Sequence, residues 1–308
     1  MKQKHLISLK DYSREDIEEI FDLAAKMKAA PGEYVQSLRG KCLGMIFQKP
    51  STRTRVSFEV GMYQLGGQAL YLGANDIQLN RGESIADTAR VLSRYVDIVM
   101  ARVFAHQDVL DLAKYGSVPV INGLSDLLHP CQALADYFTL RERRGSLDRL
   151  KVAYVGDGNN VCHELMLGAV KLGMSFACAS PKAYEPNQLI VKAAARDAQK
   201  GRVTVPVVTA DPMAAVAGAD VVYTDVWTSM GQEKEAEDRV KAFQGYQVST
   251  AMMAAAHPDA VFMHCLPAHR GEEVAADVID GPQSVVFDEA ENRLHTQKAL
   301  LVLLMGAR

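Results

Sequence analysis

Short apolar runs alternate with helical patterns along the chain, and this alternation limits the possible folds more than any other feature. The run from Cys42 to Phe47 predicts a buried strand, and the apolar spacing that begins at Val56 and includes Val60 predicts a largely buried helix over 56–65. A later unit repeats the plan with a strand, a turn and a helix at 151–155, 156–160 and 161–172. Strands that alternate with helices are typical of parallel sheets wrapped by helices, so we expect an α/β fold.

The remaining pattern extends the same plan over two domains, a number that suits a chain of 308 residues. The charged segment Arg141 to Leu150, which contains Gly145, is the best boundary between them. We expect further strands at 68–72, 97–103, 118–121, 176–180, 203–208, 221–226, 261–265 and 285–287, and helices that begin after Ser13 and near 84, 133 and 211. The terminal helix, whose apolar run is 299–305, follows 291–295.

The segment Lys49-Pro50-Ser51-Thr52-Arg53-Thr54-Arg55 lies between the first strand and its helix. A helix start has unpaired N–H groups and a positive dipole end, so nearby hydroxyls and arginines favour a phosphate-like anion. The simpler alternative is that Ser51 or Thr52 only caps the helix and that the arginines are solvated.

Other polar side chains follow strand ends in the first half. Arg102 ends a predicted strand, where parallel sheets present ligand groups, although a lone arginine is usually a surface charge. In His129-Pro130-Cys131-Gln132 the proline suits the first helical position, so His129 occupies the N-cap and shares a rim with Gln132. A capping or core histidine is an equal alternative. We expect residues 73–83 to be a mobile loop.

The second half carries three further features. The turn Gly156-Asp157-Gly158-Asn159-Asn160 is similar to a dinucleotide fingerprint, but Val161 replaces the third glycine, so we do not favour NAD. Asp225 ends a strand before a loop through Asp238 that we expect to move, and it could bind a substrate ammonium or cap a turn. His264-Cys265 lacks further ligands at recognisable spacing, so we expect no metal, and Cys265 could be a buried apolar thiol.

Charge and cysteine content exclude several classes. Lys and Arg total 34 against 37 for Asp and Glu, and this net charge of −3 favours neither nucleic acid nor a membrane surface as partner. The five cysteines are odd in number and widely spaced, which suits reduced thiols in the cytoplasm. The first nine residues are too polar for a signal peptide, and 299–305 is too short to span a bilayer, so we expect a soluble cytoplasmic protein.

Four motifs in order resemble the aspartate and ornithine transcarbamylases, and most closely the ornithine transcarbamylase family. They are S-T-R-T-R at 51–55, H-P-C-Q at 129–132, D-V-W-T-S-M-G at 225–231 and H-C-L-P at 264–267. One departure is Val226, where the family often has Thr. The resemblance covers nearly the whole chain.

The resemblance implies two doubly wound parallel-sheet domains, with the active site in the cleft between them. Residues 1–146, joined by the terminal helix 291–308, would bind carbamoyl phosphate, and 147–290 would bind ornithine. The family transfers the carbamoyl group directly to the δ-amine of ornithine, without cofactor or metal, and is built on trimers. A sister enzyme acting on putrescine or an acylated ornithine is the near alternative; an NAD-linked oxidoreductase and a non-catalytic phosphate-binding module are more remote.

The resemblance also assigns roles to individual residues. The carbamoyl phosphate set is Ser51, Thr52, Arg53, Thr54, Gln78, Arg102, His129, Gln132, Cys265, Leu266 and Arg293, and we expect Gln78 to be supplied across a subunit boundary. The ornithine set is Asn160, Asp225, Ser229 and Met230. The resemblance gives catalytic roles to Arg102, His129, Cys265 and Arg293.

Overall fold

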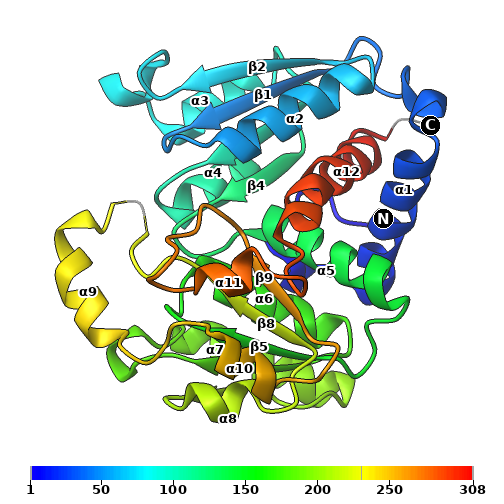
Figure 1. The fold of residues 1–308 in the computed structure, drawn as a ribbon. Helices are drawn as coiled ribbons and strands as arrows, with labels where there is room; N and C mark the ends of the chain where they lie inside the picture. Colours follow the sequence, from blue (N-terminus) through cyan, green and yellow to red (C-terminus); the bar gives the residue numbers. More distant parts are fainter. Residues whose placement is uncertain (1, 230, 307–308) are drawn as a thin grey trace. The chain divides into compact units, whose positions relative to one another are not determined.

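The computed structural model describes residues 2–229 and 231–306, and the chain divides into two compact units. Unit 1 comprises Met1–Phe138 and Glu291–Arg308, and unit 2 comprises Thr139–Ala290. Each unit contains one wholly parallel sheet, so the two-domain α/β fold predicted from the alternating pattern is confirmed (Figure 1). No helix of the described residues is long and apolar enough to cross a membrane.

Unit 1 has a four-stranded sheet in the order β2-β1-β3-β4. The strands are β1 (Cys42–Phe47), β2 (Gln68–Gly73), β3 (Ile98–Arg102) and β4 (Val120–Leu124). Helices α3 (Ile85–Leu92) and α4 (His106–Tyr115) pack on one face through a core that includes Ala89, Val99 and Leu112. From β1 the chain moves to β2 at the edge of the sheet, and from β2 it moves back past β1 to β3. Because these two crossovers run in opposite directions and are right-handed, α2 (Thr52–Gln64) lies on the face opposite α3 and α4 (Figure 1).

Three further helices complete unit 1 or join it to unit 2. They are α1 (Arg14–Ala29), α5 (Pro130–Arg144) and α12 (Val286–Met305), and the division between the units falls within α5 and α12. Helix α1 begins with the predicted capping box, in which Ser13 accepts from the backbone N–H of Asp16 and the Asp16 carboxylate accepts from that of Ser13. Short 3-10 turns lie at 9–11, 31–34 and 78–81.

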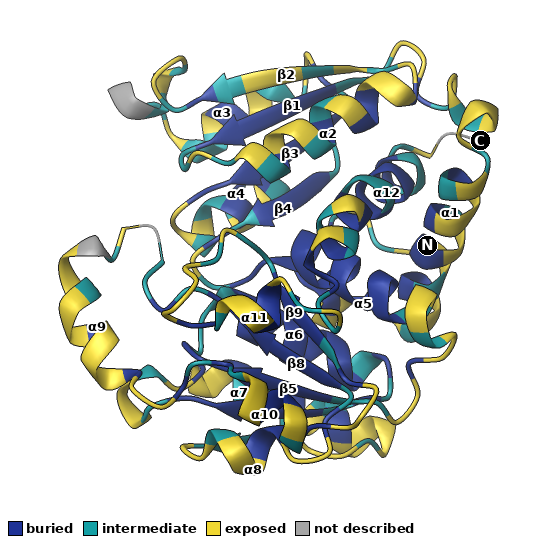
Figure 2. Ribbon diagram, viewed as in Figure 1, coloured by how far each residue is buried: buried dark blue, intermediate teal, exposed yellow. Residues whose placement is uncertain are grey.

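Unit 2 has a five-stranded sheet in the order β7-β6-β5-β8-β9. The strands are β5 (Lys151–Val155), β6 (Ser175–Ala179), β7 (Val207–Thr209), β8 (Val221–Thr224) and β9 (Val261–His264). The helices are α6 (Asn160–Lys171), α7 (Gln188–Gly201), α8 (Pro212–Val216), α9 (Ala236–Ala242), α10 (Thr250–Ala255) and α11 (Ala276–Ile279). The central strands β5 and β8 are buried on both faces, which explains their continuous apolar runs (Figure 2).

Several local expectations need correction. The segment predicted as a strand at 285–287 is the start of α12, so Arg293 lies inside the terminal helix rather than before it. This helix begins at Val286, five residues earlier than the 291 expected. Apolar β-branched residues favoured a strand there, but helical packing decided the outcome.

Helix α2 also differs from its prediction, because only part of its apolar set is buried. Phe58 and Met62 are fully buried, whereas Val56, Val60 and Tyr63 are 49%, 36% and 82% exposed. The three exposed residues follow one another at helical spacing, so they form an outer apolar stripe. The edge strand β2 is similarly exposed, with Leu70 and Tyr71 open to solvent (Figure 2).

Candidate functional site

In unit 1 the first cluster of polar residues lies where the chain direction within the sheet reverses. Strands β1 and β3 are neighbours in the sheet, and Phe47, the last residue of β1, pairs with Arg102, the last residue of β3. The connection from β1 leads to one side and the chain after β3 leads to the other. Ligands of open parallel sheets bind outside the carboxyl ends of the strands at such a reversal.

The start of α2 provides one wall of this site. Ser51 is the N-cap, and its hydroxyl accepts from the backbone N–H of Thr54 at 3.2 Å. The helix therefore begins within the S-T-R-T-R motif, four residues earlier than predicted, and its first backbone N–H groups belong to Thr52 and Arg53. Thr54 is buried and Arg53 is half-buried, so the two side chains are not simply solvated.

The environment of His129 shows which cations the fold brings together. His129 precedes Pro130, the first residue of α5, and is 5% exposed. Burial and then the positive charges of Arg293, Arg102 and Arg53 hold the pKa of His129 well below its ordinary value. The three arginines, far apart in sequence, therefore form one cationic cluster around a neutral imidazole. Within the described chain, the buried Nδ1 atom of His129 has no hydrogen-bond partner.

Arg293 is held rigidly beside this cluster by three side chains. From α12 it donates to Gln132 Oε1 at 2.7 Å, to Thr54 Oγ1 at 3.3 Å and to Gln297 Oε1 at 3.1 Å. Gln132 in turn donates to Asp136 at 2.8 Å. Arg293 is 2% exposed, so its fixed guanidinium is a preorganised donor rather than a mobile surface charge.

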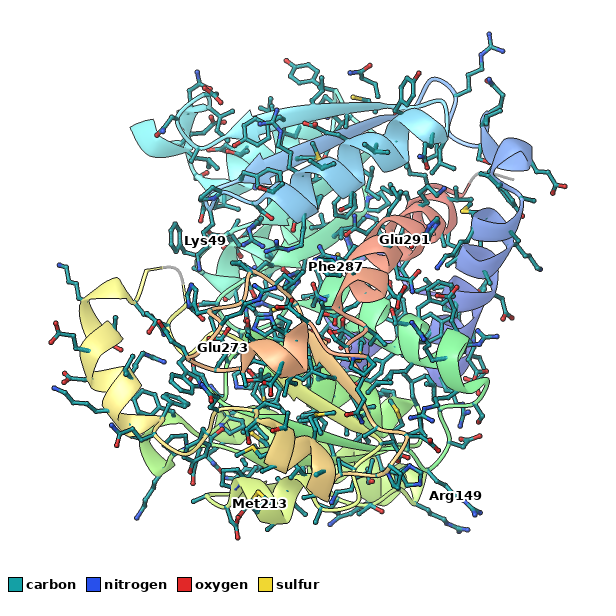
Figure 3. All side chains as sticks on the ribbon, viewed as in Figure 1. Lys49, Arg149, Met213, Glu273, Phe287 and Glu291 are labelled. Atoms are coloured by element: carbon teal, nitrogen blue, oxygen red, sulfur yellow. The ribbon has the colours of Figure 1, made fainter. Side chains whose placement is uncertain are left out.

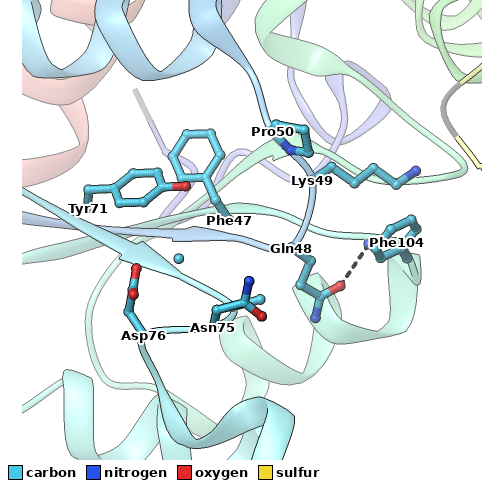
Figure 4. A pocket seen from close by; sticks show the side chains of 10 residues that line it. Phe47, Gln48, Lys49, Pro50, Tyr71, Asn75, Asp76 and Phe104 are labelled. Atoms are coloured by element: carbon cyan, nitrogen blue, oxygen red, sulfur yellow. Dashed lines mark hydrogen bonds between the residues drawn. The ribbon is translucent and has the colours of Figure 1, made fainter.

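A cavity of about 620 Å³ opens at the carboxyl ends of β1 and β2 (Figure 4). Its lining includes Lys49, Phe104 and Asp76. The Lys49 ammonium lies 4.4 Å from the centre of the Phe104 ring, and Gln48 accepts from the Phe104 backbone N–H at 2.9 Å. Burial, followed by the charge of Arg102, lowers the pKa of Lys49 despite Asp126. The cavity thus adjoins the Arg102 side of the cluster and adds a further cation to it.

Unit 2 repeats the arrangement with opposite charge. Strands β5 and β8 are neighbours at the reversal of the second sheet, and Asp225 follows β8 directly. Its carboxylate accepts from Asn159 Nδ2 at 2.7 Å, from the Val226 backbone N–H at 2.8 Å and from Cys265 Sγ at 3.0 Å. Asp225 is 7% exposed, so it is a fixed, buried carboxyl group at a strand end.

The glycine-containing turn after β5 serves chain packing. A Cβ on Gly158 would lie 2.2 Å from the Pro186 backbone nitrogen, so this glycine is required by a close approach of two segments. Asn159 then caps α6 through its side-chain oxygen, which accepts from the N–H groups of Val161 and Cys162. A dinucleotide fingerprint also contains a tight turn and a helix start. In this chain the close packing at Gly158 explains the first feature, and the Asn159 cap explains the second.

The loop after Asp225 is tied to the sheet by a buried ion pair. From α9, Arg239 donates to Asp157 at 3.1 Å and to the Trp227 carbonyl at 2.9 Å. Burial, which outweighs the opposing effect of Arg239, raises the pKa of Asp157 to about 6, and the charges of Asp225 and Glu235 act in the same direction as burial.

Several predicted residues have more open surroundings than those described above. Gln78 is exposed on the 3-10 turn 78–81, and the structure records no side-chain hydrogen bond from it to another described residue. Asn160, Ser229, Cys265 and Leu266 are half-buried, and the Ser229 backbone N–H donates to Gln232. Met230 lies outside the described residues.

Among the described residues, two groups in unit 2 have the composition of a metal site: Asp225, His264 and Cys265, and the mostly exposed His269, Glu272 and Glu273. Ligand atoms of Asp225, His264 and Cys265 lie within 4.8 Å of one another. The two His264 ring nitrogens already contact the Leu266 backbone N–H and Glu273, and Cys265 already donates to Asp225. This set therefore does not present open ligands in its present arrangement.

Sequence reasoning missed three residues that shape the site. Asn159 was overlooked in favour of Asn160, although a helix N-cap asparagine was a readable signal. His264 was considered only as a metal ligand. Glu273 carried no signal in the sequence, because its partner lies nine positions away and is reached only through the folded turn.

Comparisons with known proteins match both halves of the chain to one family. Residues 4–142 match the family model described as the carbamoyl-P binding domain of aspartate/ornithine carbamoyltransferase, and 148–304 match its Asp/Orn binding domain. The ornithine carbamoyltransferase of Thermococcus kodakarensis is 59% identical over 98% of this chain and 96% of its own length.

Solved structures give the same result for the fold. The ornithine carbamoyltransferase from Pyrococcus furiosus is similar with a TM-score of 0.94 and 58% identity, over 98% of this chain and 97% of that one. The anabolic enzyme from Campylobacter jejuni has a TM-score of 0.93 and 41% identity, over 99% and 100% of the two chains.

Proposed function

The chain belongs to the aspartate/ornithine carbamoyltransferase family, and from this premise we propose how its residues carry out carbamoyl transfer to ornithine. The reaction joins the δ-nitrogen of L-ornithine to the carbamoyl carbon of carbamoyl phosphate. The bond from that carbon to the phosphate oxygen breaks, and the products are L-citrulline and phosphate. One observation supports the assignment of residues: Arg53, at the start of α2, forms a cationic cluster around His129 together with Arg102 and Arg293.

In this proposal unit 1 binds carbamoyl phosphate. The N–H groups and hydroxyls at 51–54, with Arg53 and Arg102, bind the phosphate, since a helix start and arginine forks suit a multivalent oxyanion. His129, Gln132 and Arg293 surround the carbamoyl group. The neutral His129 donates a ring N–H to the carbonyl oxygen, which gains negative charge as the amine attacks.

Unit 2 binds the acceptor. Asp225 attracts the ammonium group of ornithine and repels the second carboxylate of aspartate, so charge favours ornithine. Asn160, Ser229 and Met230 complete the ornithine set. Cys265 orients the attacking amine and does not form a covalent bond, while Leu266 contacts both substrates. Direct transfer requires the two sets to face each other during the reaction, and the donors then stabilise the transition state more than the substrates.

We propose that the enzyme is a trimer in which Gln78 acts on a neighbouring subunit. The exposed apolar stripe of α2, with Leu70 and Tyr71 of β2, supports such an interface, because contiguous exposed apolar surface marks association. The exposure of Gln78 on its turn supports use by another copy. Five free thiols suit the cytoplasm.

Product formation with defined acceptors tests the function. Purified protein with carbamoyl phosphate and L-ornithine is expected to form citrulline and phosphate in equal amounts. N-acetylornithine is expected to react poorly, because it lacks the free α-ammonium that Asp225 binds. Putrescine keeps that ammonium but lacks the α-carboxylate, and it is expected to react poorly because the rest of the ornithine set then has no carboxylate to bind. Absence of citrulline between about pH 6 and 9, where the amine begins to deprotonate, would overturn the proposal. Binding of carbamoyl phosphate without turnover would indicate a non-catalytic protein.

A further inference from the structure

We propose that His264 and Glu273 form a buried positioning pair that holds the turn at Cys265 and Leu266 in the shape required for the acceptor amine. The inference rests on the proposed function, because it concerns the reaction of the amine bound at Asp225. Neither residue contacts the proposed substrates in this scheme. They act through the backbone of Leu266 and the thiol of Cys265.

The turn after β9 contains an unusual backbone conformation that needs support. Leu266 has a φ of +57°, in the left-handed region that a branched, non-glycine residue rarely adopts. Its backbone N–H donates to His264 Nδ1 at 2.8 Å. The imidazole of His264 therefore holds the chain two residues further on in this conformation.

The bond to Leu266 also determines the tautomer of His264. Because Nδ1 accepts a hydrogen bond, the proton of the neutral ring is on Nε2. That nitrogen lies 3.2 Å from Glu273 Oε1, so it donates to the carboxylate. Both side chains are fully buried, and a buried hydrogen bond of this kind fixes the ring orientation.

Glu273 closes the turn and anchors it to the rest of unit 2. Its Oε1 atom also accepts from the His269 backbone N–H at 2.6 Å, and its own carbonyl accepts from the Val248 N–H at 2.9 Å. Glu273 lies in the segment that precedes α11 (Figure 3). The pair thus spans both ends of the turn from 264 to 273.

The pair reaches the proposed acceptor site through Cys265. The His264 backbone N–H donates to Glu289 at 3.1 Å, and the Leu266 N–H is held by the His264 ring, so Cys265 lies between two fixed points. Its thiol then donates to Asp225 at 3.0 Å. Loss of the acceptor at Glu273 is expected to free the ring, relax Leu266 and weaken the thiol contact with Asp225.

The neighbouring ionisable groups provide a matched control. His269 Nδ1 lies 3.7 Å from Glu272 and 3.9 Å from Glu273, and the His269 and Glu272 side chains are each about half exposed. Glu272 carries the same charge beside Glu273 but makes no contact with His264. Changes at Glu272 therefore report on charge near the turn without affecting the pair.

The test measures the reactivity of Cys265 with the disulfide reagent DTNB in the full chain, in a Cys42→Ser background. Attack by the Cys265 thiolate forms a mixed disulfide and releases one thionitrobenzoate. Cys265 and Cys42 are the two half-buried cysteines, and the other three are buried. In Glu273→Ala, a relaxed turn should raise the rate at least about fivefold, since local opening exposes the thiol. Glu273→Gln, which keeps an acceptor, and Glu272→Ala should match the parent.

Kinetics provide the second readout. Glu273→Ala should lower kcat/KM for ornithine by about tenfold or more, because misplacement of an orienting group by a fraction of an ångström is costly. Glu273→Asp keeps the charge but moves the carboxylate away from His264, so its kcat/KM should lie between those of the parent and the Ala variant. The Asp variant replaces the Ala variant if the latter fails to fold. Unchanged thiol reactivity in both the Asp and Ala variants would overturn the inference. A parent that makes no citrulline would instead refute the function, while the thiol measurement would still test the pair.

Discussion

At the scale of single residues, His129 shows how surroundings decide chemistry. An exposed histidine is partly protonated near neutral pH, whereas burial and the charges of Arg293, Arg102 and Arg53 keep this one neutral. A neutral ring has one donor nitrogen, and in our scheme this nitrogen donates to the substrate oxygen. A protonated ring would add one more positive charge to an already cationic cluster.

Replacement of His129 tests this donor. His129→Leu should lower kcat about 10²-fold, whereas His129→Asn, whose amide keeps an N–H donor, should retain more activity. The measurement is steady-state citrulline formation at saturating substrates. Equal activity in the Leu and Asn variants would show that donation at this position does not contribute.

The same histidine predicts a pH dependence of stability. Its folded-state pKa is lowered, so the unfolded chain binds the proton more tightly. Its contribution to the free energy of unfolding is therefore present above the ordinary value of about 6.5 and is lost as pH falls below it. Urea unfolding from about pH 5 to 8 should show a smaller pH dependence in His129→Asn than in the parent. Parallel curves would contradict the lowered pKa.

At the scale of elements, the start of α2 combines a structural and a binding role. Ser51 caps this helix, and Ser13 caps α1 in the same way by accepting from the N–H three residues later. Each cap stabilises its helix, but in our scheme only the start of α2 meets phosphate. The two serines therefore form a natural pair of variant and control.

Ser51→Ala and Ser13→Ala should each lower the free energy of unfolding by about 1 kcal/mol. Only Ser51→Ala should also raise KM for carbamoyl phosphate, because it removes a hydroxyl from the phosphate set. Denaturant unfolding and substrate titration check the two effects. A similar rise in KM in both variants would show that helix stability, and not the hydroxyl, limits binding.

The tie between α9 and the turn after β5 has its own pH signature. The pKa of Asp157 is raised to about 6, so the stability linked to its protonation is fully present below the ordinary value and is lost as pH rises through about 6. Asp157→Asn cannot ionise and should escape this loss. Its stability relative to the parent should therefore increase from about pH 4 to 7.5, by up to roughly 3 kcal/mol. A pH-independent difference between the two proteins would refute the raised pKa.

At the scale of the whole molecule, the exposed stripe of α2 and the edge strand β2 are the main features that the fold leaves uncovered. An edge strand with exposed apolar residues invites association unless it is covered. Tyr63, at 82% exposed, lies within the proposed interface, and Leu189 of α7, at 74% exposed, lies in unit 2. These two residues allow a matched test of assembly.

Sedimentation equilibrium should give three times the mass of the 33.7 kDa chain for the parent. Tyr63→Glu should dissociate it and reduce citrulline formation, because a charge in an apolar interface is costly and Gln78 would lose its neighbour. Leu189→Glu should leave both mass and activity unchanged. A parent that sediments as a monomer with full activity would refute both the trimer and the shared role of Gln78.

The sequence predicted much of the fold because its strongest signals are local. The strand at 42–47, the capping box at Ser13 and the helix start after His129 each depend on residues within a few positions. The strand predicted at 285–287 was wrong because β-branched residues are weak evidence where distant packing favours a helix. The burial predicted for Val56 and Val60 was wrong because spacing identifies an apolar face but not what covers it.

The sequence by itself determined the units of this protein: strands that end in polar turns, and helices that begin with hydroxyls and prolines. These features need only chain neighbours, because caps, dipoles and dihedral preferences act over one or two turns. Only the tertiary structure decided which strand ends lie together. Three features depend on the tertiary structure: His129 is neutral, Asn159 and Cys265 donate to Asp225, and His264 pairs with Glu273. Charges and hydrogen bonds act through space between residues that are distant in sequence. The strand order brings these residues together, and no local segment of the sequence determines that order.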